Sequence, residues 1–140
     1  MVQHEKTKSV SVRSYDGLVA WQKARALVKR IYGATKLFPK DELYGLTQQI
    51  RRSAVSVPSN IAEGHGREGI GEYLYHLTVS RGSLYEVETQ IILGCDIGYL
   101  TQAQTTSLLD DTTECSKMLQ GLIKSLKKKR NPNKTPNPAP

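Results

Sequence analysis

Apolar residues recur every three or four positions in four stretches of this sequence, and only the short run around Val10 and Val12 alternates apolar and polar residues as a β-strand does. Steps of three and four residues return side chains to one side of an α-helix, so each stretch predicts a helix with one buried face. The first helix is expected at about 16–36, with its N-cap at Asp16. Its apolar face comprises Leu18, Trp21, Ala24, Leu27, Val28, Ile31 and Thr35.

The second predicted helix runs from Leu43 to the glycines of 64–66. Pro58 lies inside it and is expected to kink it, because proline lacks the backbone N–H that the helix would use. The third predicted helix spans about 73–98 and has the cleanest alternation of steps of four and three.

The fourth predicted helix follows a capping box between Thr101 and Gln104 and ends near residue 126. Helices of about 20 residues with connections of a few residues pack most simply as antiparallel neighbours. The sequence therefore predicts an all-α protein, an antiparallel up-down-up-down four-helix bundle.

A length of 140 residues suits one domain core and is too short for two. We expect a flexible N-terminal segment over 1–14, the bundle over 15–126, and a disordered basic tail rich in Pro and Asn over 127–140, which lacks large apolar side chains. No apolar run is long enough for a membrane span and the N-terminus lacks a secretory signal, so a cytoplasmic protein without a membrane partner is expected. Cys95 and Cys115 are interpreted as reduced packing residues.

The net charge of +7 is unevenly distributed. Residues 14–67 contain nine Lys or Arg against four Asp or Glu, whereas residues 68–126 contain three against eight. Residues 127–140 add five basic residues and no acidic one. The predicted bundle is therefore neutral as a whole but strongly polarised.

The basic side chains form candidate contacts for a nucleic acid, because Lys and Arg bind phosphates. The sequence has no recognisable base-reading module, so any binding is expected to be directed at the backbone and weakly selective for sequence. The opposing interpretation is solvated basic residues with a solubilising tail. The candidate nucleic-acid-binding residues are Lys23, Arg25, Lys29, Arg30, Arg51, Arg52, Lys127, Lys128, Lys129 and Arg130.

Several polar residues occupy positions at the edges of the predicted buried faces. Arg81 and Glu88 lie seven residues apart on the third helix and are expected to be at least half buried. A hydrogen-bonded network between the second and third helices is predicted, because isolated charges there would be costly and satisfied ones can fix the helix register. The members of this structural polar network are Arg52, Asn60, Glu63, Arg81 and Glu88.

Additional apolar residues lie on the outer sides of the second and third helices. They are Tyr44, Val55 and Ala62 on the second, and Tyr75, Val79 and Leu93 on the third. Such stripes favour a subunit interface, although scattered exposed apolar residues are also normal. A basic first half meeting the acidic second half of the next copy would give a head-to-tail contact that can close into a ring. Compensation between helices of one chain is the alternative.

Catalysis has no positive support in the sequence. Glu72, His76 and His65 are the best metal candidates, but their spacing does not match a di-iron bundle, and we interpret them as surface residues. The glycines of 64–71 are interpreted as a turn, because no strand precedes them and no Gly-Lys-Ser/Thr follows. We expect no enzyme activity, no metal, no cofactor and no small-molecule substrate.

Three segments carry a resemblance to a known family. They are LVAWQKA from Leu18, YGLTQQIRRSAVSVPSNIAEG from Tyr44, and RGSLYEVET from Arg81, followed by Gly98-Tyr99-Leu100. Together they resemble the bacterial four-helix-bundle proteins known as the 23S rRNA intervening-sequence protein family, over about 15–127. The SVPSNIAEG segment is the most specific part of this resemblance.

The resemblance implies a left-handed four-helix bundle that assembles as a ring-shaped homopentamer and has no known catalytic activity. A related branch comprises the accessory variability determinants of diversity-generating retroelements, which are basic pentamers that bind a reverse transcriptase and its template RNA. We therefore predict a non-enzymatic oligomeric scaffold that binds RNA, or a nucleic-acid-handling protein such as a reverse transcriptase, through basic patches. The alternative is a protein–protein interaction module that does not bind nucleic acid.

Overall fold

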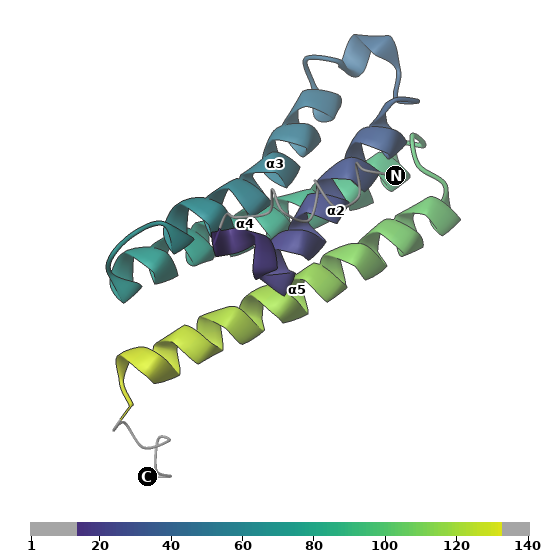
Figure 1. The fold of residues 1–140 in the computed structure, drawn as a ribbon. Helices are drawn as coiled ribbons and strands as arrows, with labels where there is room; N and C mark the ends of the chain where they lie inside the picture. Colours follow the sequence, from purple (N-terminus) through teal and green to yellow (C-terminus); the bar gives the residue numbers. More distant parts are fainter. Residues whose placement is uncertain (1–13, 133–140) are drawn as a thin grey trace, which may run out of the picture.

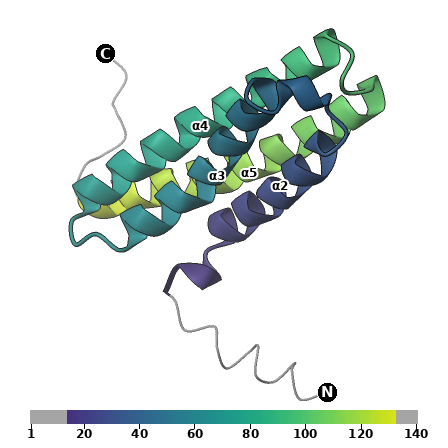
Figure 2. The same ribbon diagram turned by 90° about the horizontal axis from the view of Figure 1, so that it is seen from above.

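The computed structural model describes residues 14–132, which fold into four α-helices and two short 3-10 helices. Each α-helix contacts the one before and after it, and the first also contacts the last, so the four close into a bundle (Figures 1 and 2). The predicted all-α four-helix bundle is confirmed. The elements are η1 (Ser14–Gly17), α2 (Val19–Thr35), η2 (Lys40–Glu42), α3 (Leu46–His65), α4 (Ile70–Asp96) and α5 (Gln102–Arg130).

The core contains one apolar face from each α-helix, at the steps of three and four residues seen in the sequence. Burial of these faces supplies the main favourable free energy of folding. Among residues 14–132, no helix is both long enough and apolar enough to cross a membrane. Core side chains that are at most 2% exposed include Ala24, Leu27, Ile31, Ile50, Val57, Ile61, Leu77, Leu84, Ile91, Leu108, Cys115 and Leu119.

The predicted capping box begins α5. The backbone N–H of Gln104 donates to Thr101 Oγ1 at 3.0 Å, and the backbone N–H of Thr101 donates to Gln104 Oε1 at 2.8 Å. These bonds satisfy two donors at the helix start that have no partner within the helix. The turn before this cap contains Gly98, whose φ of +87° lies in the left-handed region that glycine adopts without steric cost.

The first helix begins later than predicted. The N-cap of α2 is Leu18 and not Asp16, because residues 14–17 form the separate 3-10 turn η1. The N–H of Leu18 donates to the carbonyl of Tyr15 at 3.0 Å, and the side chain of Gln22 donates to the carbonyl of Asp16 at 2.8 Å. These two bonds hold the entry to α2 in a turn.

The start of the second helix also differs from the prediction. α3 begins at Leu46 and not at Leu43, whose side chain is 49% exposed outside the core. The carboxylate of Glu42 explains this boundary, since it accepts the N–H of Leu46 at 3.0 Å and the hydroxyl of Tyr99 at 2.7 Å. From there α3 continues without interruption through Pro58 to His65.

The last helix is longer than predicted. α5 continues to Arg130, so residues 127–130 are helical although the prediction placed them in a disordered tail. Lys and Arg are good helix formers, and positive charges in the last turn of a helix interact favourably with its dipole. The predicted flexible segment over 1–13 and the remainder of the tail from 133 lie outside the described residues.

α3 and α4 make the most extensive contact in the bundle. Gly64 allows their close approach near the turn that joins them. A Cβ atom at this position would lie 2.7 Å from the Cβ of His76 and 3.0 Å from Cδ1 of Tyr73. Real Cβ atoms essentially never come as close to another atom as 2.7 Å. The absence of a side chain at Gly64 therefore sets the separation of the two helices at this end.

Candidate functional site

The basic residues of α2 face two different neighbours. Arg30 contacts α5, where its guanidinium pairs with Asp111 and donates to Ser107 Oγ at 3.1 Å. Arg25 lies toward α3, with its guanidinium 5.5 Å from the centre of the Trp21 ring. Lys23 and Lys29 are exposed. The candidate nucleic-acid residues of α2 therefore do not form one surface, and Arg30 is already paired within the chain.

Two adjoining hollows of about 530 and 350 Å³ lie along α2 and α3, and Val55 lines both. We call them together the α2–α3 groove. No Asp or Glu is found among the described residues that line it. The lining residues are Tyr15, Trp21, Arg25, Val28, Tyr32, Leu43, Tyr44, Thr47, Gln48, Arg51, Arg52, Val55, Ser56, Pro58, Ser59 and Ala62.

Arg51 is held in place within this groove. Its Nε donates to Thr35 Oγ1 at 2.8 Å, and its guanidinium carbon lies 4.5 Å from the centre of the Tyr32 ring. Arg52 is exposed at the next position of α3 and also lines the groove. Three arginines, Arg25 included, thus line a groove that also contains Val55 and, among the described residues, no carboxylate.

The outer apolar stripe of the second helix opens into this groove. Tyr44 is 83% exposed and Val55 is 40% exposed, and both line it together with Ala62. On α4, Tyr75 and Leu93 of the second predicted stripe are 65% and 46% exposed. Large apolar side chains are thus available on the surface of α3 and α4, as a subunit or partner contact would require.

A ladder of small polar side chains joins α3 to α4. Ser83 Oγ donates to Ser56 Oγ at 2.8 Å, and Ser80 Oγ donates to the backbone carbonyl of Val57 at 2.9 Å. Because these bonds satisfy polar groups between two closely packed helices, they fix the register of the α3–α4 pair.

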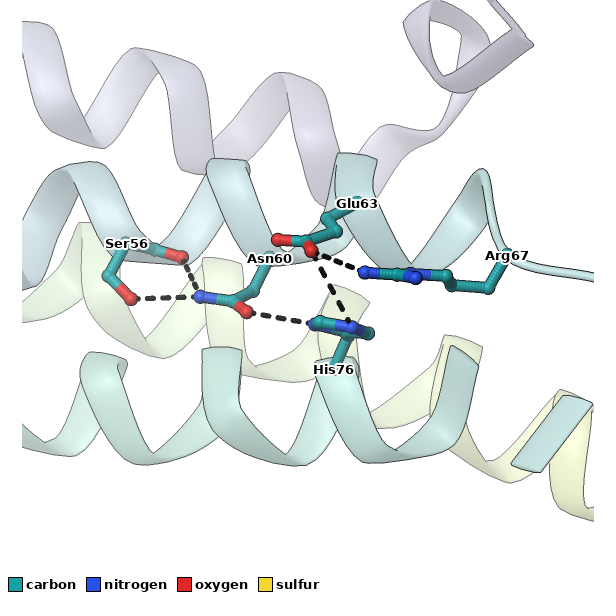
Figure 3. Close-up of polar contacts among 5 residues, drawn as sticks. All are labelled: Ser56, Asn60, Glu63, Arg67 and His76. Atoms are coloured by element: carbon teal, nitrogen blue, oxygen red, sulfur yellow. Dashed lines mark hydrogen bonds and ion pairs between the residues drawn. The ribbon is translucent and has the colours of Figure 1, made fainter. Parts of the chain in front are cut away.

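Asn60 lies between Ser56 of α3 and His76 of α4 and contacts both (Figure 3). Its Nδ2 donates to the carbonyl of Ser56 at 2.9 Å, and its Oδ1 lies 3.1 Å from Nδ1 of His76. Oε2 of Glu63 accepts from Arg67 at 2.7 Å and lies 3.9 Å from Nε2 of His76 (Figure 3). Asn60, Glu63, Arg67 and His76 thus form one polar cluster at the end of the bundle where α3 joins α4.

The other three predicted members of the network lie elsewhere. Arg52 is exposed, while Arg81 and Glu88 are part-buried on α4. None of these three forms a hydrogen bond or an ion pair within the described part of the chain. Arg81 instead faces α5, where it lines a depression of about 390 Å³ with Lys124 and Lys127.

The sequence analysis missed the α4 partners of this ladder, chiefly His76, Ser83 and Glu86, whose carboxylate accepts from Ser53 at 3.3 Å. Ser80 and Ser83 lie among the apolar residues of α4, and these small polar residues on a buried face are the sequence feature that indicates hydrogen bonds to α3. The hydrogen bond between His76 and Asn60 depends on the register of two helices, which the sequence does not reveal. In the described part of the chain, no three His, Cys, Asp or Glu side chains gather as a metal site would require.

The two cysteines are free, with Cys115 buried in the core. Burial raises the pKa of the Cys115 thiol to about 12, and the positive charge of Lys23 opposes that rise. A thiol with this pKa is essentially uncharged at neutral pH, so Cys115 has the character of a packing residue.

The basic residues at the end of α5 are exposed. Lys127, Lys128, Lys129 and Arg130 form the last turn, and none forms an ion pair within residues 14–132. This turn lies at the end of the bundle where α3 and α4 are joined (Figure 2), and Arg130 approaches Gly71 there. These residues are therefore free to bind an anionic partner.

Comparisons with known proteins agree with the fold and do not indicate a catalytic family. Residues 16–121 match the family model described as 23S rRNA-intervening sequence protein. The chain is similar to a crystal structure from Bacteroides thetaiotaomicron VPI-5482, described as a protein with unknown function from the S23 ribosomal protein family. That match has a TM-score of 0.70 and 26% sequence identity, and covers 76% of this chain and 96% of the other. No curated protein matches the chain.

Proposed function

Because this chain belongs to the 23S rRNA-intervening sequence protein family, we propose that it is a non-enzymatic, homo-oligomeric scaffold that binds RNA through its basic surfaces. The observation that carries the proposal is the separation of charge in the folded chain. Arginines line the α2–α3 groove without a carboxylate, and the last turn of α5 is entirely basic. Eight of the acidic residues lie within 68–126, on the other half of the bundle.

Self-assembly is the role we assign to the α2–α3 groove. Its apolar lining residues and its three arginines complement an acidic surface that presents apolar side chains, which the 68–126 half of a second copy supplies. Such a contact joins different faces of two copies, so it forms a ring when the rotation closes. A ring of five is the assembly that the family resemblance implies.

RNA binding is the role we assign to Lys127, Lys128, Lys129 and Arg130. A ring repeats this basic turn once per copy, and each added phosphate contact raises affinity and steepens the dependence on salt. The absence of aromatic residues from this turn supports binding to phosphates and not to bases. Affinity for RNA is therefore expected to be insensitive to sequence.

The test is size-exclusion chromatography with light scattering and absorbance at two wavelengths, on full-length protein purified without nuclease. An oligomeric mass with excess ultraviolet absorbance that disappears at high salt is the expected result. A clean oligomer that also fails to bind added single-stranded RNA at low salt would exclude RNA as the partner.

A charge variant locates the RNA contact. Replacing Lys127, Lys128, Lys129 and Arg130 with Gln should lower affinity and reduce the slope of log affinity against log salt by about 2 to 3, since each single-strand contact contributes about 0.7. The matched control replaces four exposed lysines of the first half, Lys23, Lys29, Lys36 and Lys40, with Gln. Equal losses in both variants would show that the last turn of α5 is not the specific RNA contact.

A second function is favoured by the α2–α3 groove alone. Its apolar lining residues and arginines also suit a protein partner with acidic and apolar side chains, such as a nucleic-acid-handling enzyme of the reverse transcriptase kind. A protein-interaction module of this type would bind its partner without RNA. The charge variant of α5 separates the two functions, because it should not affect a partner that binds the groove.

A further inference from the structure

Arg81 is a part-buried residue of α4. It forms no hydrogen bond or ion pair with any of residues 14–132. A guanidinium has five N–H donors and stays charged at every physiological pH, so Arg81 keeps its full capacity to bind an anionic acceptor.

The surroundings of Arg81 increase the positive charge. Lys124 and Lys127 of α5 line the same depression of about 390 Å³, and no Asp or Glu is among its described lining residues. Residues 68–126 contain eight acidic residues and only three basic ones, yet two of those three, Arg81 and Lys124, meet here. Mutual repulsion of these cations is relieved when an anion binds between them.

Gly121 of α5 lines the depression and has no side chain to fill it. A Cβ atom at this position would meet no other atom within 4 Å. Glycine inside a helix costs about 1 kcal/mol relative to alanine, so this opening is obtained at the expense of helix stability. The volume lies at the lower end of the range for small-ligand sites.

Glu88 does not neutralise the cluster. It lies seven residues after Arg81 on α4, or about 10 Å along the helix axis, and does not line the depression. Glu86, the nearer carboxylate in sequence, is bonded to Ser53 on the α3 side. All charged residues among those that line the depression are therefore positive.

We propose that this depression, lined by Arg81, Gln120, Gly121, Ile123, Lys124 and Lys127, is a phosphate-binding site. The planar guanidinium of Arg81 can bind two phosphate oxygens at once, while Lys124 and Lys127 contribute point charges. The site continues into the basic turn at the end of α5 through Lys127. It takes a backbone phosphate of the bound RNA strand, and this source of the phosphate rests on the proposed function.

Two measurements on the full chain test the site. The first is the affinity for a fluorescently labelled single-stranded oligoribonucleotide, followed by anisotropy. The second is the melting temperature with and without pyrophosphate at constant ionic strength. Wild-type protein should bind the RNA, and its melting temperature should rise by at least about 3 °C in saturating pyrophosphate, since a ligand of the native state stabilises it.

Two variants address charge and space separately. Arg81→Met removes the charge and the guanidinium but keeps an unbranched apolar side chain, and should weaken RNA binding about tenfold, as the loss of charged hydrogen bonds does. Gly121→Leu keeps every charge, fills the depression and favours the helix, and should weaken binding to a similar degree. The control is Lys117→Gln, which removes a charge from α5 outside the depression and should change affinity by about twofold or less. Melting of each variant without ligand verifies its fold.

The outcomes separate the site from the proposed function. Loss of both RNA affinity and the pyrophosphate shift in Arg81→Met and Gly121→Leu supports a site for RNA phosphates. Loss of the shift alone supports a site for a free phosphate compound and overturns RNA as its source. Unchanged RNA binding in both variants, with no pyrophosphate shift in wild type, overturns the site while the proposed function stands. If wild-type protein binds no RNA, the proposed function fails and the pyrophosphate shift alone decides the site.

Discussion

Asn60 of α3 and His76 of α4 are joined by a hydrogen bond of 3.1 Å between Asn60 Oδ1 and His76 Nδ1 (Figure 3). An amide oxygen only accepts, so the bond requires the proton of the imidazole on Nδ1. The amide nitrogen of Asn60 meanwhile donates to Ser56. Asn60 therefore connects the polar side chains of its own helix to the neighbouring helix.

Asn60→Ala should lower the free energy of unfolding by about 1 to 3 kcal/mol, because the substitution leaves the part-buried imidazole without its acceptor. Urea denaturation followed by circular dichroism measures the change. Gln49→Ala, at an exposed position of α3 outside the α2–α3 groove, is the control and should shift stability by less than about 0.5 kcal/mol. Equal effects of the two substitutions would contradict a structural role for the Asn60–His76 bond.

Gly64→Ala should destabilise the protein although alanine favours helices. The new Cβ atom would lie 2.7 Å from the Cβ of His76, so α3 and α4 must separate, at a cost of roughly 1 to 3 kcal/mol. Gly33→Ala is the matched control within α2, where a Cβ meets nothing within 4 Å, and it should stabilise the protein by up to about 1 kcal/mol. Opposite signs in thermal melts of the two variants are expected, and a stabilised Gly64→Ala would show that the helices separate easily.

Val55→Lys should convert the proposed oligomer into smaller species without unfolding the bundle. Val55 is 40% exposed in the single chain and lies in both hollows of the α2–α3 groove, where a second copy would cover it. A lysine there places a charge in the covered part of the interface, and the cost of removing that charge from water outweighs its attraction to the acidic surface of the next copy. Light scattering after size exclusion reports the mass. Leu37→Lys, 83% exposed and outside the groove, should leave the mass unchanged.

Stability should depend on pH through Glu42. Hydrogen bonds from the backbone N–H of Leu46 and from the hydroxyl of Tyr99 hold the pKa of its carboxyl below the ordinary value of 4.5. The folded state thus binds the proton less readily than the unfolded state, so the stabilisation is fully present above the ordinary pKa and is lost as pH falls through the lower folded value.

Urea denaturation at several values between pH 6 and pH 2 tests this dependence. The stability difference between wild type and Glu42→Gln should be largest at pH 6 and shrink toward low pH. Tyr99→Phe should remove part of the difference, because the carboxylate then keeps only the bond from Leu46. Tyr85→Phe, at an exposed hydroxyl on α4, is the control. A difference that stays constant over this range would rule out Glu42 as the titrating group.

Helix content and the buried faces were predictable because they depend on local spacing. Leu27, Ile31 and Leu84 recur at helical steps in the sequence, and each is at most 1% exposed in the bundle. The capping box at Thr101 was predictable for the same reason, since its two partners lie only three residues apart. The start of α3 was not, because Tyr99 donates to Glu42 from 57 residues away.

The polar network shows where local spacing stops being informative. The positions of Arg81 and Glu88 in the sequence predict a hydrogen-bonded or ionic partner for each. Neither has such a partner within the described part of the chain, and Arg81 lines a depression with two lysines of α5. Which side chain meets which depends on the rotation and register of whole helices. A shift of one residue along a helix turns a side chain by about 100°, enough to change its neighbour.

The sequence by itself determined that this chain forms four amphipathic helices, where most of them end, and that its charge is divided between two halves. These properties follow from the order of residues along one helix, which backbone geometry converts directly into faces and caps. Only the tertiary structure decided that Asn60 meets His76, that three arginines line the groove along α2 and α3, and that Arg81 lines one depression with Lys124 and Lys127. Those contacts are set by packing between helices, where one glycine at position 64 fixes how closely two backbones approach.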